Sequence, residues 1–524
     1  MPDTSVFSFR EMALRGHGTL GRRLIQLVLS ATLRLFFRRI ETCGAGRVPT
    51  AEPLIFVLNH PNGLIDPALV FCALPRKISF LAKSTLFTMP VIGRLLRAVE
   101  ALPVYRRVDT PADVSLNRLT FRRCHQMLRR NRCIAIFPEG RSHNETSLLP
   151  VKTGAARIAL GALSAGDKSE QTGEHAGEGL KFSMGGGTDA AGGTDFSTGG
   201  GAEGEDDFSP SEGGPTLTGL KIVPVGLYYT AKTRFRSEAL ISFGEPFEVA
   251  PAAPDEDGEP PREAVQELSR RIERALREVT LNVPDDEELE TVARGEQLFS
   301  SIYESLNFRQ PLAAEFELRR RFAETLTRRP QSLPRRVEDL RARLREYEED
   351  LRRFGIVPEN LSVLAHSRWH VFRHFLLRLG VLLLLSPLVA VGALLHMPAY
   401  LLSTLFSQLF RKHGVDDIRP TVKILAAVVL MPLTWLTLAA LVYLTFGWRP
   451  ALLSIPAAAL CGYVALRSLE ETYDLRGWFR ASLLLARDRR RFLRLLLERR
   501  SLHREVRRLV ETDAAAAPAV DGGD

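Results

Sequence analysis

The chain has 524 residues, of which 45% are hydrophobic and 25% are charged, and its formal net charge is +9. Its five cysteines show no paired spacing and no CxxC motif, which excludes a disulfide-stapled secreted scaffold and a cysteine metal cluster. The averages hide two different parts, because residues 375–468 are dominated by Leu, Ala and Val while residues 255–355 are densely charged. The positive charge suits an anionic partner, and the long apolar segments favour a membrane surface over nucleic acid.

The first element expected is a basic amphipathic helix over residues 20–40, within an N-terminal membrane-associated segment, 1–45. Its apolar face is predicted to enter the lipid while its arginines stay at the headgroups. A core helix with a few exposed arginines is the alternative. Arg34 interrupts the apolar run and Arg38 follows it, so neither a cleavable signal peptide nor a clean membrane span is expected here.

Residues 46–250 are predicted to form an α/β domain with a central, mostly parallel sheet, because short apolar runs alternate there with helix-like segments. The expected strands are 54–58, 78–82, 134–137, 222–227 and 239–243, and the expected helices are 66–74, 113–130 and 152–164. Residues 165–216 interrupt this pattern with Gly, Ser, Thr, Asp and Glu, so we expect a disordered insertion between two elements.

Residues 251–365 are predicted to be a charged helical region. The sequence EDLRARLREYEEDLRR carries many opposite charges three and four residues apart, which is typical of solvated helices. A helical hairpin or a short coiled coil is the simplest expectation for this region.

Residues 366–470 are predicted to hold the transmembrane helices, and a crossing helix needs about 20 apolar residues. The apolar runs are 375–395, 399–410, 422–448 and 451–466. Residues 471–524 follow, with an arginine-rich helix expected to lie on anionic lipid and a disordered tail. Because positive charge marks the cytoplasmic side, we expect an integral membrane protein with its soluble domain and C-terminus on that face, and with two or four crossings.

His60 is the first candidate for chemistry. It follows the expected strand 54–58, at the end of the strand where α/β folds place their ligands, and Asp66 follows after a turn-forming Pro-Asn-Gly. Six positions is not a same-face helical spacing, so a contact between the two residues requires that turn to fold back. In such a contact the carboxylate fixes the imidazole tautomer and leaves the other ring nitrogen to take a proton.

Three further segments accompany this pair. LPVYRR contains Arg106, and FPEGRSH contains Gly140 and Arg141 after an expected strand. Arg106 and Arg141 are suited to gripping a phosphate, helped by backbone N–H groups near Gly140. The last segment, IVPVGL at 222–227, is an apolar strand that at most lines a hydrophobic slot.

In this order and approximate spacing, NHPNGLID, LPVYRR, FPEGRSH and IVPVGL resemble the four motif blocks of the glycerolipid acyltransferase superfamily. Members of that family acylate glycerol 3-phosphate and lysophospholipids, with acyl-CoA or acyl-carrier protein as the donor. The resemblance covers roughly residues 50–250. It implies an acyltransferase-like α/β domain, followed here by the charged helical region and the C-terminal transmembrane helices.

By position, the resemblance implies that His60 is the general base and that Asp66 orients it. The implied substrate-binding residues are Arg106, Glu139, Gly140, Arg141 and Pro224. Of these, Arg106 is implied to bind the acceptor's phosphate and Pro224 to lie beside the acyl-donor channel. No metal and no cofactor are expected, since acyl-CoA or acyl-carrier protein is a co-substrate. The other expected partners are the phosphorylated acceptor and membrane lipids.

One departure from the family pattern bears on the acceptor. Most members have four residues between the His and the Asp, whereas five residues, 61–65, stand between them here. The longer spacing resembles the branch that includes fungal glycerol 3-phosphate and dihydroxyacetone phosphate acyltransferases, as does the LLPVKTG stretch at 148–154.

The expected reaction is therefore acylation of the sn-1 hydroxyl of glycerol 3-phosphate, with dihydroxyacetone phosphate as a further acceptor. Acylation of 1-acylglycerol 3-phosphate or another lysophospholipid is the alternative. A non-catalytic, lipid-binding membrane scaffold that keeps the same fold is the third hypothesis.

Overall fold

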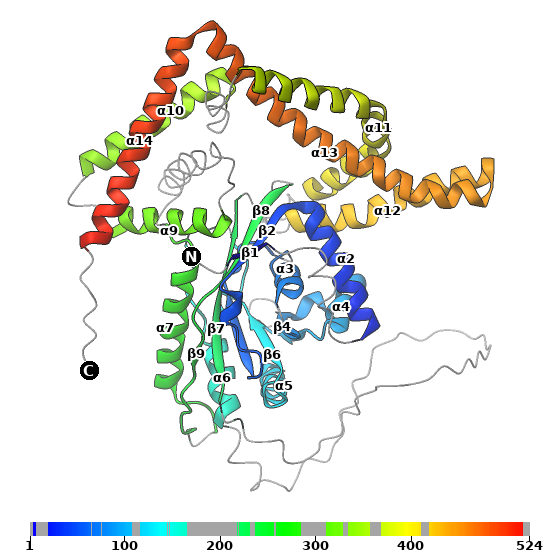
Figure 1. Cartoon of the computed structure of the whole chain (residues 1–524). Coiled ribbons are helices and arrows are strands. Elements are labelled where there is room, and N and C mark those ends of the chain that lie inside the picture. Colours follow the sequence, from blue (N-terminus) through cyan, green and yellow to red (C-terminus); the bar gives the residue numbers. More distant parts are fainter. Residues whose placement is uncertain are drawn as a thin grey trace.

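The computed structural model contains an α/β unit, several charged helices and a group of long apolar helices (Figure 1). The described residues are 4–6, 19–63, 65–74, 76–106, 116–143, 145, 147–164, 217, 219–230, 236–255, 258–283, 311–328, 334–356, 368–409 and 419–516. The whole of the predicted disordered insertion at 165–216 lies outside these ranges, and so do residues 517–524 of the predicted C-terminal helix and tail.

Among the described residues, a nine-stranded sheet forms the centre of the α/β unit. Its strands are β1 (Thr4–Val6), β2 (Phe37–Cys43), β3 (Leu54–Leu58), β4 (Ile78–Lys83), β5 (Leu102–Val104), β6 (Cys133–Ile136), β7 (Lys221–Tyr229), β8 (Ser237–Phe243) and β9 (Phe247–Glu248). Their order is β1-β2-β8-β7-β3-β6-β4-β5, with β9 paired to β7. Pairing is parallel except for β1–β2, β7–β8 and β7–β9. The predicted mostly parallel sheet is confirmed, and each of the five expected strands is present.

Helices cover both faces of this sheet (Figure 1). They are α2 (Leu20–Phe36), α3 (Ile65–Ala73), α4 (Pro90–Ala98), α5 (Asn117–Arg129), α6 (Gly154–Ser164) and α7 (Arg262–Val279). In β3, Leu54, Phe56 and Leu58 join the cluster with α2 and α3, whereas Ile55 and Val57 join the cluster with α5, α6 and α7. Because both faces are covered, the strand is a continuous apolar run rather than an alternating one.

Helix α2 is shorter than predicted, because residues 37–43 continue as strand β2. Phe37 and Ile40 are fully buried. Parallel pairing with β8 gives the backbone N–H and C=O groups of these residues the hydrogen bonds that a longer helix would otherwise have provided. The sequence pattern of apolar and basic residues fits either conformation locally, so the pairing with a distant strand decides.

The same helix turns its polar side towards the α/β unit. Arg22 is buried and donates hydrogen bonds to the carbonyl oxygens of Ile78 (2.9 Å) and Val99 (2.8 Å). Burial and, to a smaller extent, the charge of Arg132 lower the pKa of this guanidinium to about 10. The outer face of the helix is apolar, and its exposed large side chains are Leu20, Leu24, Leu27, Val28 and Leu35.

Helix α7 packs against β3, β7 and α6, although the boundary predicted at residue 250 assigns it to the charged region. Its apolar residues recur every three or four positions and are buried: Val265, Leu268, Ile272, Leu276 and Val279. The charges seen in the sequence are the outer face of an amphipathic helix. Gly226 of β7 permits the close approach, because a Cβ there would overlap the carbonyl oxygen of Val279.

The remaining charged helices are α9 (Leu312–Arg328), α10 (Pro334–Phe354) and α14 (Arg489–Ala516). The structure packs α10 against the distant α14, where a helical hairpin or a short coiled coil was the expectation (Figure 1). Leu344 and Tyr347 of α10 share a buried cluster with Phe492 and Leu495 of α14. This contact covers part of the apolar face of α14, the helix predicted to lie on anionic lipid.

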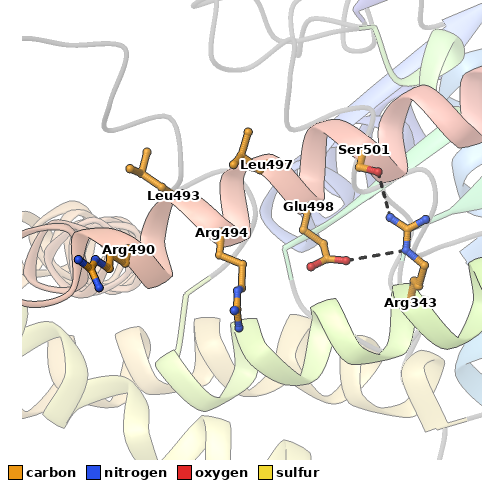
Figure 2. A pocket seen from close by; sticks show the side chains of 7 residues that line it. All are labelled: Arg343, Arg490, Leu493, Arg494, Leu497, Glu498 and Ser501. Atoms are coloured by element: carbon orange, nitrogen blue, oxygen red, sulfur yellow. Dashed lines mark hydrogen bonds and ion pairs between the residues drawn. The ribbon is translucent and has the colours of Figure 1, made fainter.

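A groove of about 560 Å³ lies between α10 and α14 (Figure 2). It is lined by Arg343, Arg490, Leu493, Arg494, Leu497, Glu498 and Ser501. Arg343 donates a hydrogen bond to the Ser501 hydroxyl (3.0 Å) and forms an ion pair with Glu505 (2.6 Å). These polar contacts join the two helices, and none of the predicted site residues is among those that line the groove.

Within the described chain, three helices are long and apolar enough to cross a membrane. They are α11 (Arg368–Leu409), α12 (Arg419–Phe446) and α13 (Trp448–Arg487). The runs predicted separately at 375–395 and 399–410 belong to the single helix α11, which contains Pro387 and Pro398. The run 451–466 is the first part of α13.

Helix α11 reverses its direction along its length (Figure 1). Its first part runs antiparallel to α13, because Arg378 pairs with Glu471 (2.9 Å) and the later Gly392 packs on the earlier Cys461. The prolines inside the helix provide a physical cause for a bend.

The last part of α11 runs antiparallel to α12. His396 accepts a hydrogen bond from the indole N–H of Trp435 (2.8 Å), whereas Tyr400 lies beneath the ammonium of Lys423 at 5.0 Å, nearer the start of α12. As residue numbers rise in α11, those of the partners in α12 fall. The helix therefore enters the apolar group and turns back within it.

Gly226→Ala tests the contact between β7 and α7. We expect the free energy of unfolding to fall by about 1–3 kcal/mol, because the added methyl overpacks a contact between backbone atoms. The measurement is the melting temperature of the detergent-solubilised protein.

Gly154→Ala is the matched control, because no other atom lies within 4 Å of where its Cβ would be. The same methyl there should leave stability unchanged or raise it by about 0.5–1 kcal/mol. Wild-type stability in Gly226→Ala would contradict the packing described.

Candidate active site

His60 leaves the carboxyl end of β3, the strand at the middle of the sheet. The preceding Asn59 fixes this exit to β7, since its side-chain amide donates to the Leu227 carbonyl oxygen (3.0 Å) and accepts from the Leu227 N–H (2.7 Å). The His60 ring is half-buried and stacks on Phe137, with centroids 4.2 Å apart. His60, a predicted site residue, therefore stands in a fixed position just beyond the carboxyl end of a central strand.

The turn after His60 folds back and brings Asp66 to the imidazole. His60 Nδ1 and Asp66 Oδ2 are 2.9 Å apart, and Oδ2 also accepts the N–H of Asn62 (2.7 Å). The N–H groups of Ile65 and Asp66 in turn bond to the Asn62 carbonyl oxygen. Asp66 lies in the first turn of α3, where a carboxylate is favoured by the helix dipole. The start of α3 thus brings Asp66 back to His60 across the five residues between them.

This contact determines what the imidazole can do. A carboxylate at Nδ1 favours the tautomer with hydrogen on that nitrogen, which leaves Nε2 to accept a proton. Asp66 is fully buried, so its charge is directed at a few partners rather than shared with solvent. The pair has the arrangement of a general base and the carboxylate that orients it.

Tyr229 is a third member of this group, and it was not among the predicted site residues. Its hydroxyl donates to Asp66 Oδ1 (2.5 Å) from the end of β7. The residue lies two positions beyond the IVPVGL segment, and no local pattern connects it with a carboxylate that lies 163 positions earlier.

Glu139 is buried beneath the site and joins two loops. Its Oε1 accepts the backbone N–H of His60 (2.7 Å), and its Oε2 accepts the N–H of Leu149 (2.9 Å) and contacts the His143 ring. The His143 N–H also bonds to the His60 carbonyl oxygen (3.2 Å). Glu139 therefore holds the backbone of His60, and its side chain is closed off from solvent.

Cationic side chains gather at the turn that follows β6. Arg106 donates to the Gly140 carbonyl oxygen (2.8 Å), and Gly140 has a positive φ of 71°, which a residue with a side chain rarely adopts. The ammonium of Lys152 lies over the same glycine, 2.5 Å from where a Cβ would be. Arg141 is exposed on this turn.

Lys152 was not among the predicted residues, although it lies within the LLPVKTG stretch. Its backbone N–H bonds to the Pro138 carbonyl oxygen (2.9 Å), which places it beside FPEG. Three cationic side chains, those of Arg106, Arg141 and Lys152, thus belong to the turn around Gly140 or contact it, and we call this group the cationic turn. Such a group suits a phosphate.

Pro224 lies elsewhere. It is buried inside β7, level with Val57 of β3, and its carbonyl oxygen accepts the N–H of Gly244 (2.8 Å). Among the described contacts, none joins it to His60 or to the cationic turn. The structure therefore brings six of the seven predicted residues together and leaves Pro224 in the sheet.

Other reactive groups of the α/β unit are buried and poorly suited to chemistry. Burial raises the pKa of the Cys72 and Cys124 thiols to about 12 and that of Cys133 to about 11. Burial also lowers the pKa of His125 to about 4, so this imidazole is a weak base. Among the described residues, no three His, Cys, Asp or Glu side chains form a group that could hold a metal ion.

Comparisons with known proteins agree with the motifs. Residues 39–169 match the family model described as Acyltransferase. Residues 297–517 match the model described as Glycerol-3-phosphate acyltransferase 2 C-terminal domain. The resemblance that the four motif blocks predicted is confirmed by the first match, and the second places a family-specific region over the charged and apolar helices.

Curated relatives match the chain over part of their length. Glycerol-3-phosphate O-acyltransferase 2 of Saccharomyces cerevisiae is 26% identical over 61% of this chain and 37% of its own length. Glycerol-3-phosphate O-acyltransferase 1 of the same yeast is 24% identical over 84% of this chain and 61% of its own. A chloroplastic 1-acyl-sn-glycerol-3-phosphate acyltransferase of Brassica napus is 27% identical over 24% of this chain and 34% of its own. The chain spans less than two thirds of each.

Glu139→Gln tests whether this buried carboxylate holds the two loops. We expect the free energy of unfolding to fall by about 1–3 kcal/mol, because the amide NH₂ group cannot accept one of the buried N–H groups. The melting temperature is the measurement. Glu145→Gln, the same change at an exposed position of the neighbouring loop, should leave it unchanged. Equal melting temperatures for the two variants would contradict the bracing role.

Proposed function

We propose that this chain, which carries a domain of the acyltransferase family, transfers a fatty acyl group to the sn-1 hydroxyl of glycerol 3-phosphate. The donor is acyl-CoA or acyl-carrier protein, and dihydroxyacetone phosphate is a further acceptor. The observation that carries the proposal is the 2.9 Å contact between His60 and Asp66, next to the cationic turn. One feature supplies a base, and the other suits the phosphate of the acceptor.

In the proposed reaction, His60 Nε2 removes the proton of the acceptor hydroxyl while its oxygen attacks the thioester carbonyl carbon. The carbon–sulfur bond then breaks, and the imidazolium returns the proton to the departing thiolate. The products are an ester and a free thiol. Asp66 stabilises the imidazolium, as the carboxylate does in other His–Asp pairs. General-base help of this kind contributes about 100- to 10,000-fold.

The cationic turn positions the acceptor in this proposal. Arg106, Arg141 and Lys152 bind the phosphate, which holds the hydroxyl in attack geometry and lowers the entropic cost of the encounter. Glu139 stabilises the backbone beneath both parts of the site. Pro224 is proposed to lie beside the acyl-donor channel, where it contributes as a buried residue of β7 and, among the described contacts, makes none with His60. The reaction needs no cofactor beyond the donor.

Two observations favour the first acylation step over the second. The five residues between His60 and Asp66 resemble the spacing of the glycerol 3-phosphate branch, and two relatives that align over more than half of this chain are named glycerol-3-phosphate O-acyltransferases. The named Brassica relative supports the alternative, acylation of 1-acylglycerol 3-phosphate, over a shorter alignment. A non-catalytic scaffold has no need for the complete set of base, orienting carboxylate and cationic turn.

The chain lies in the membrane with its site on the cytoplasmic face in this proposal. Helix α2 packs against α12 and turns five large apolar side chains outward, which suits the lipid side of the interface. Helices α12 and α13 form a hairpin that crosses twice, while α11 turns back. Two crossings keep the α/β unit and the arginine-rich α14 on one side, which is cytoplasmic by its positive charge.

His60→Ala tests the base. We expect acyl transfer to glycerol 3-phosphate to fall by about 100- to 10,000-fold, followed as free thiol released from palmitoyl-CoA. Melting temperature and membrane association should stay close to those of the wild type. The same assay with 1-acylglycerol 3-phosphate separates the two acylation steps. Full activity in the variant would remove His60 as the base.

Cysteine labelling tests the two crossings. In a background in which the native cysteines are replaced, Arg449→Cys lies at the hairpin tip and Arg500→Cys lies on α14. A membrane-impermeant maleimide should label the first from outside intact cells and the second only after permeabilisation. Labelling of both from the same side would show that the number of crossings between them is even, against the proposal.

A further inference from the structure

The Asp66 carboxylate has two oxygens with different partners. Oδ2 faces His60, while Oδ1 accepts the hydroxyl of Tyr229, a residue outside the four motif blocks. We infer that Tyr229 is a positioning residue of the transfer reaction, which fixes the orientation of the Asp66 carboxylate and, through it, the imidazole ring. The inference rests on the proposed role of His60 as the base.

The partners of Asp66 oppose rotation of the carboxylate. Turning about its Cβ–Cγ bond would exchange the two oxygens, and this terminal torsion is soft in aspartate. Tyr229 holds Oδ1 at 2.5 Å, and the backbone N–H of Asn62 holds Oδ2 at 2.7 Å. With both ends held, Oδ2 remains directed at His60 Nδ1. Without Tyr229, one buried oxygen loses its donor and the carboxylate gains freedom to turn.

Tyr229 is itself held in place. Its ring stacks on Phe37, with centroids 5.6 Å apart and planes 23° from parallel. Its backbone lies in register with Ala239, in the antiparallel pair of β7 and β8. The residue is only 6% exposed. A hydroxyl fixed by packing orients its acceptor at little further cost in side-chain entropy.

The protonation state of Tyr229 suits a donor. Burial raises the pKa of its hydroxyl well above the ordinary value of 10.0, and the charge of Asp66 raises it further. The phenol therefore keeps its proton throughout the pH range in which a histidine acts as a base. The hydrogen bond to Asp66 is present over that whole range.

Tyr228 offers a matched comparison one position earlier. Because side chains alternate along a strand, it points to the opposite side of the sheet from Tyr229. Its ring contacts Phe316 of α9, with centroids 4.9 Å apart, and its hydroxyl contacts the Arg319 guanidinium. Removal of either hydroxyl deletes a contact with a charged group, but only Tyr229 contacts the site.

The first experiment compares Tyr229→Phe with Tyr228→Phe in the full chain, with palmitoyl-CoA and the acceptor that supports turnover. For Tyr229→Phe we expect kcat to fall about 10- to 100-fold, the equivalent of one hydrogen bond to a charged group. Both KM values should stay within about twofold of wild type, because no substrate contact is lost. Tyr228→Phe should keep the wild-type kcat. A wild-type kcat in Tyr229→Phe overturns the inference.

Melting temperatures of both variants are measured alongside, so that loss of folded protein is not read as loss of kcat. Both substitutions keep the ring and leave no cavity. A fall in kcat that disappears when activity is normalised to folded protein also overturns the inference.

The second experiment needs no turnover. Diethyl pyrocarbonate modifies histidine at an unprotonated ring nitrogen, and mass spectrometry of the peptide that contains His60 gives the rate. We compare the wild type, Tyr229→Phe, Asp66→Asn and the double variant. If Tyr229 acts through Asp66, Tyr229→Phe changes the rate at least about threefold and adds nothing in the Asp66→Asn background. Equal rates in wild type and Tyr229→Phe, or the same change in both backgrounds, overturn the inference.

Together the two experiments separate this inference from the proposed function. A chain that turns over none of the donors, but shows the coupling in the modification of His60, loses the proposed function and keeps the positioning role of Tyr229. A chain that turns over the substrates equally well with and without Tyr229→Phe keeps the proposed function and loses the positioning role of Tyr229.

Discussion

The candidate site depends on the complete burial of the Asp66 carboxylate at the start of α3. A buried carboxylate is costly unless hydrogen-bond donors replace the solvent it has lost. Three donors do so here, the ring of His60, the backbone N–H of Asn62 and the hydroxyl of Tyr229. They come from the exit of β3, the following turn and the end of β7. Satisfying the hydrogen bonds of one side chain therefore fixes three segments relative to one another, and His60, the proposed base, stands among them.

Glu139 repeats this principle on the other side of His60. It is nearly as deeply buried, and it accepts the backbone N–H groups of His60 and Leu149. Each carboxylate is thus committed to holding structure. In the proposed reaction, the groups that act on the substrate are the second imidazole nitrogen and the cationic side chains at Gly140. This division suits the proposed reaction, in which a rigid base meets a mobile, phosphorylated acceptor.

The C-terminal region is fastened to the same sheet, which relates the site to the apolar helices. The buried Glu41 of β2 accepts the N–H of Leu312 at the start of α9 (2.5 Å). Arg236, beside β8, pairs with Glu470 of α13 and donates its backbone N–H to the Phe36 carbonyl oxygen at the end of α2 (2.7 Å). These contacts hold α2 and α13 together at one edge of the α/β unit.

The sequence by itself determined the features that depend on local pattern. The run 54–58 had to be a buried strand, His60 had to stand at its end, and the long apolar runs had to be helices, because neighbouring residues set hydropathy and periodicity. The tertiary structure alone decided where distant segments meet. It ended α2 at Phe36 through pairing with β8, moved α7 onto the sheet, bent α11 back, and brought Tyr229 and Lys152 to the site. Those outcomes depend on contacts between residues far apart in the chain, whose energies no local pattern records.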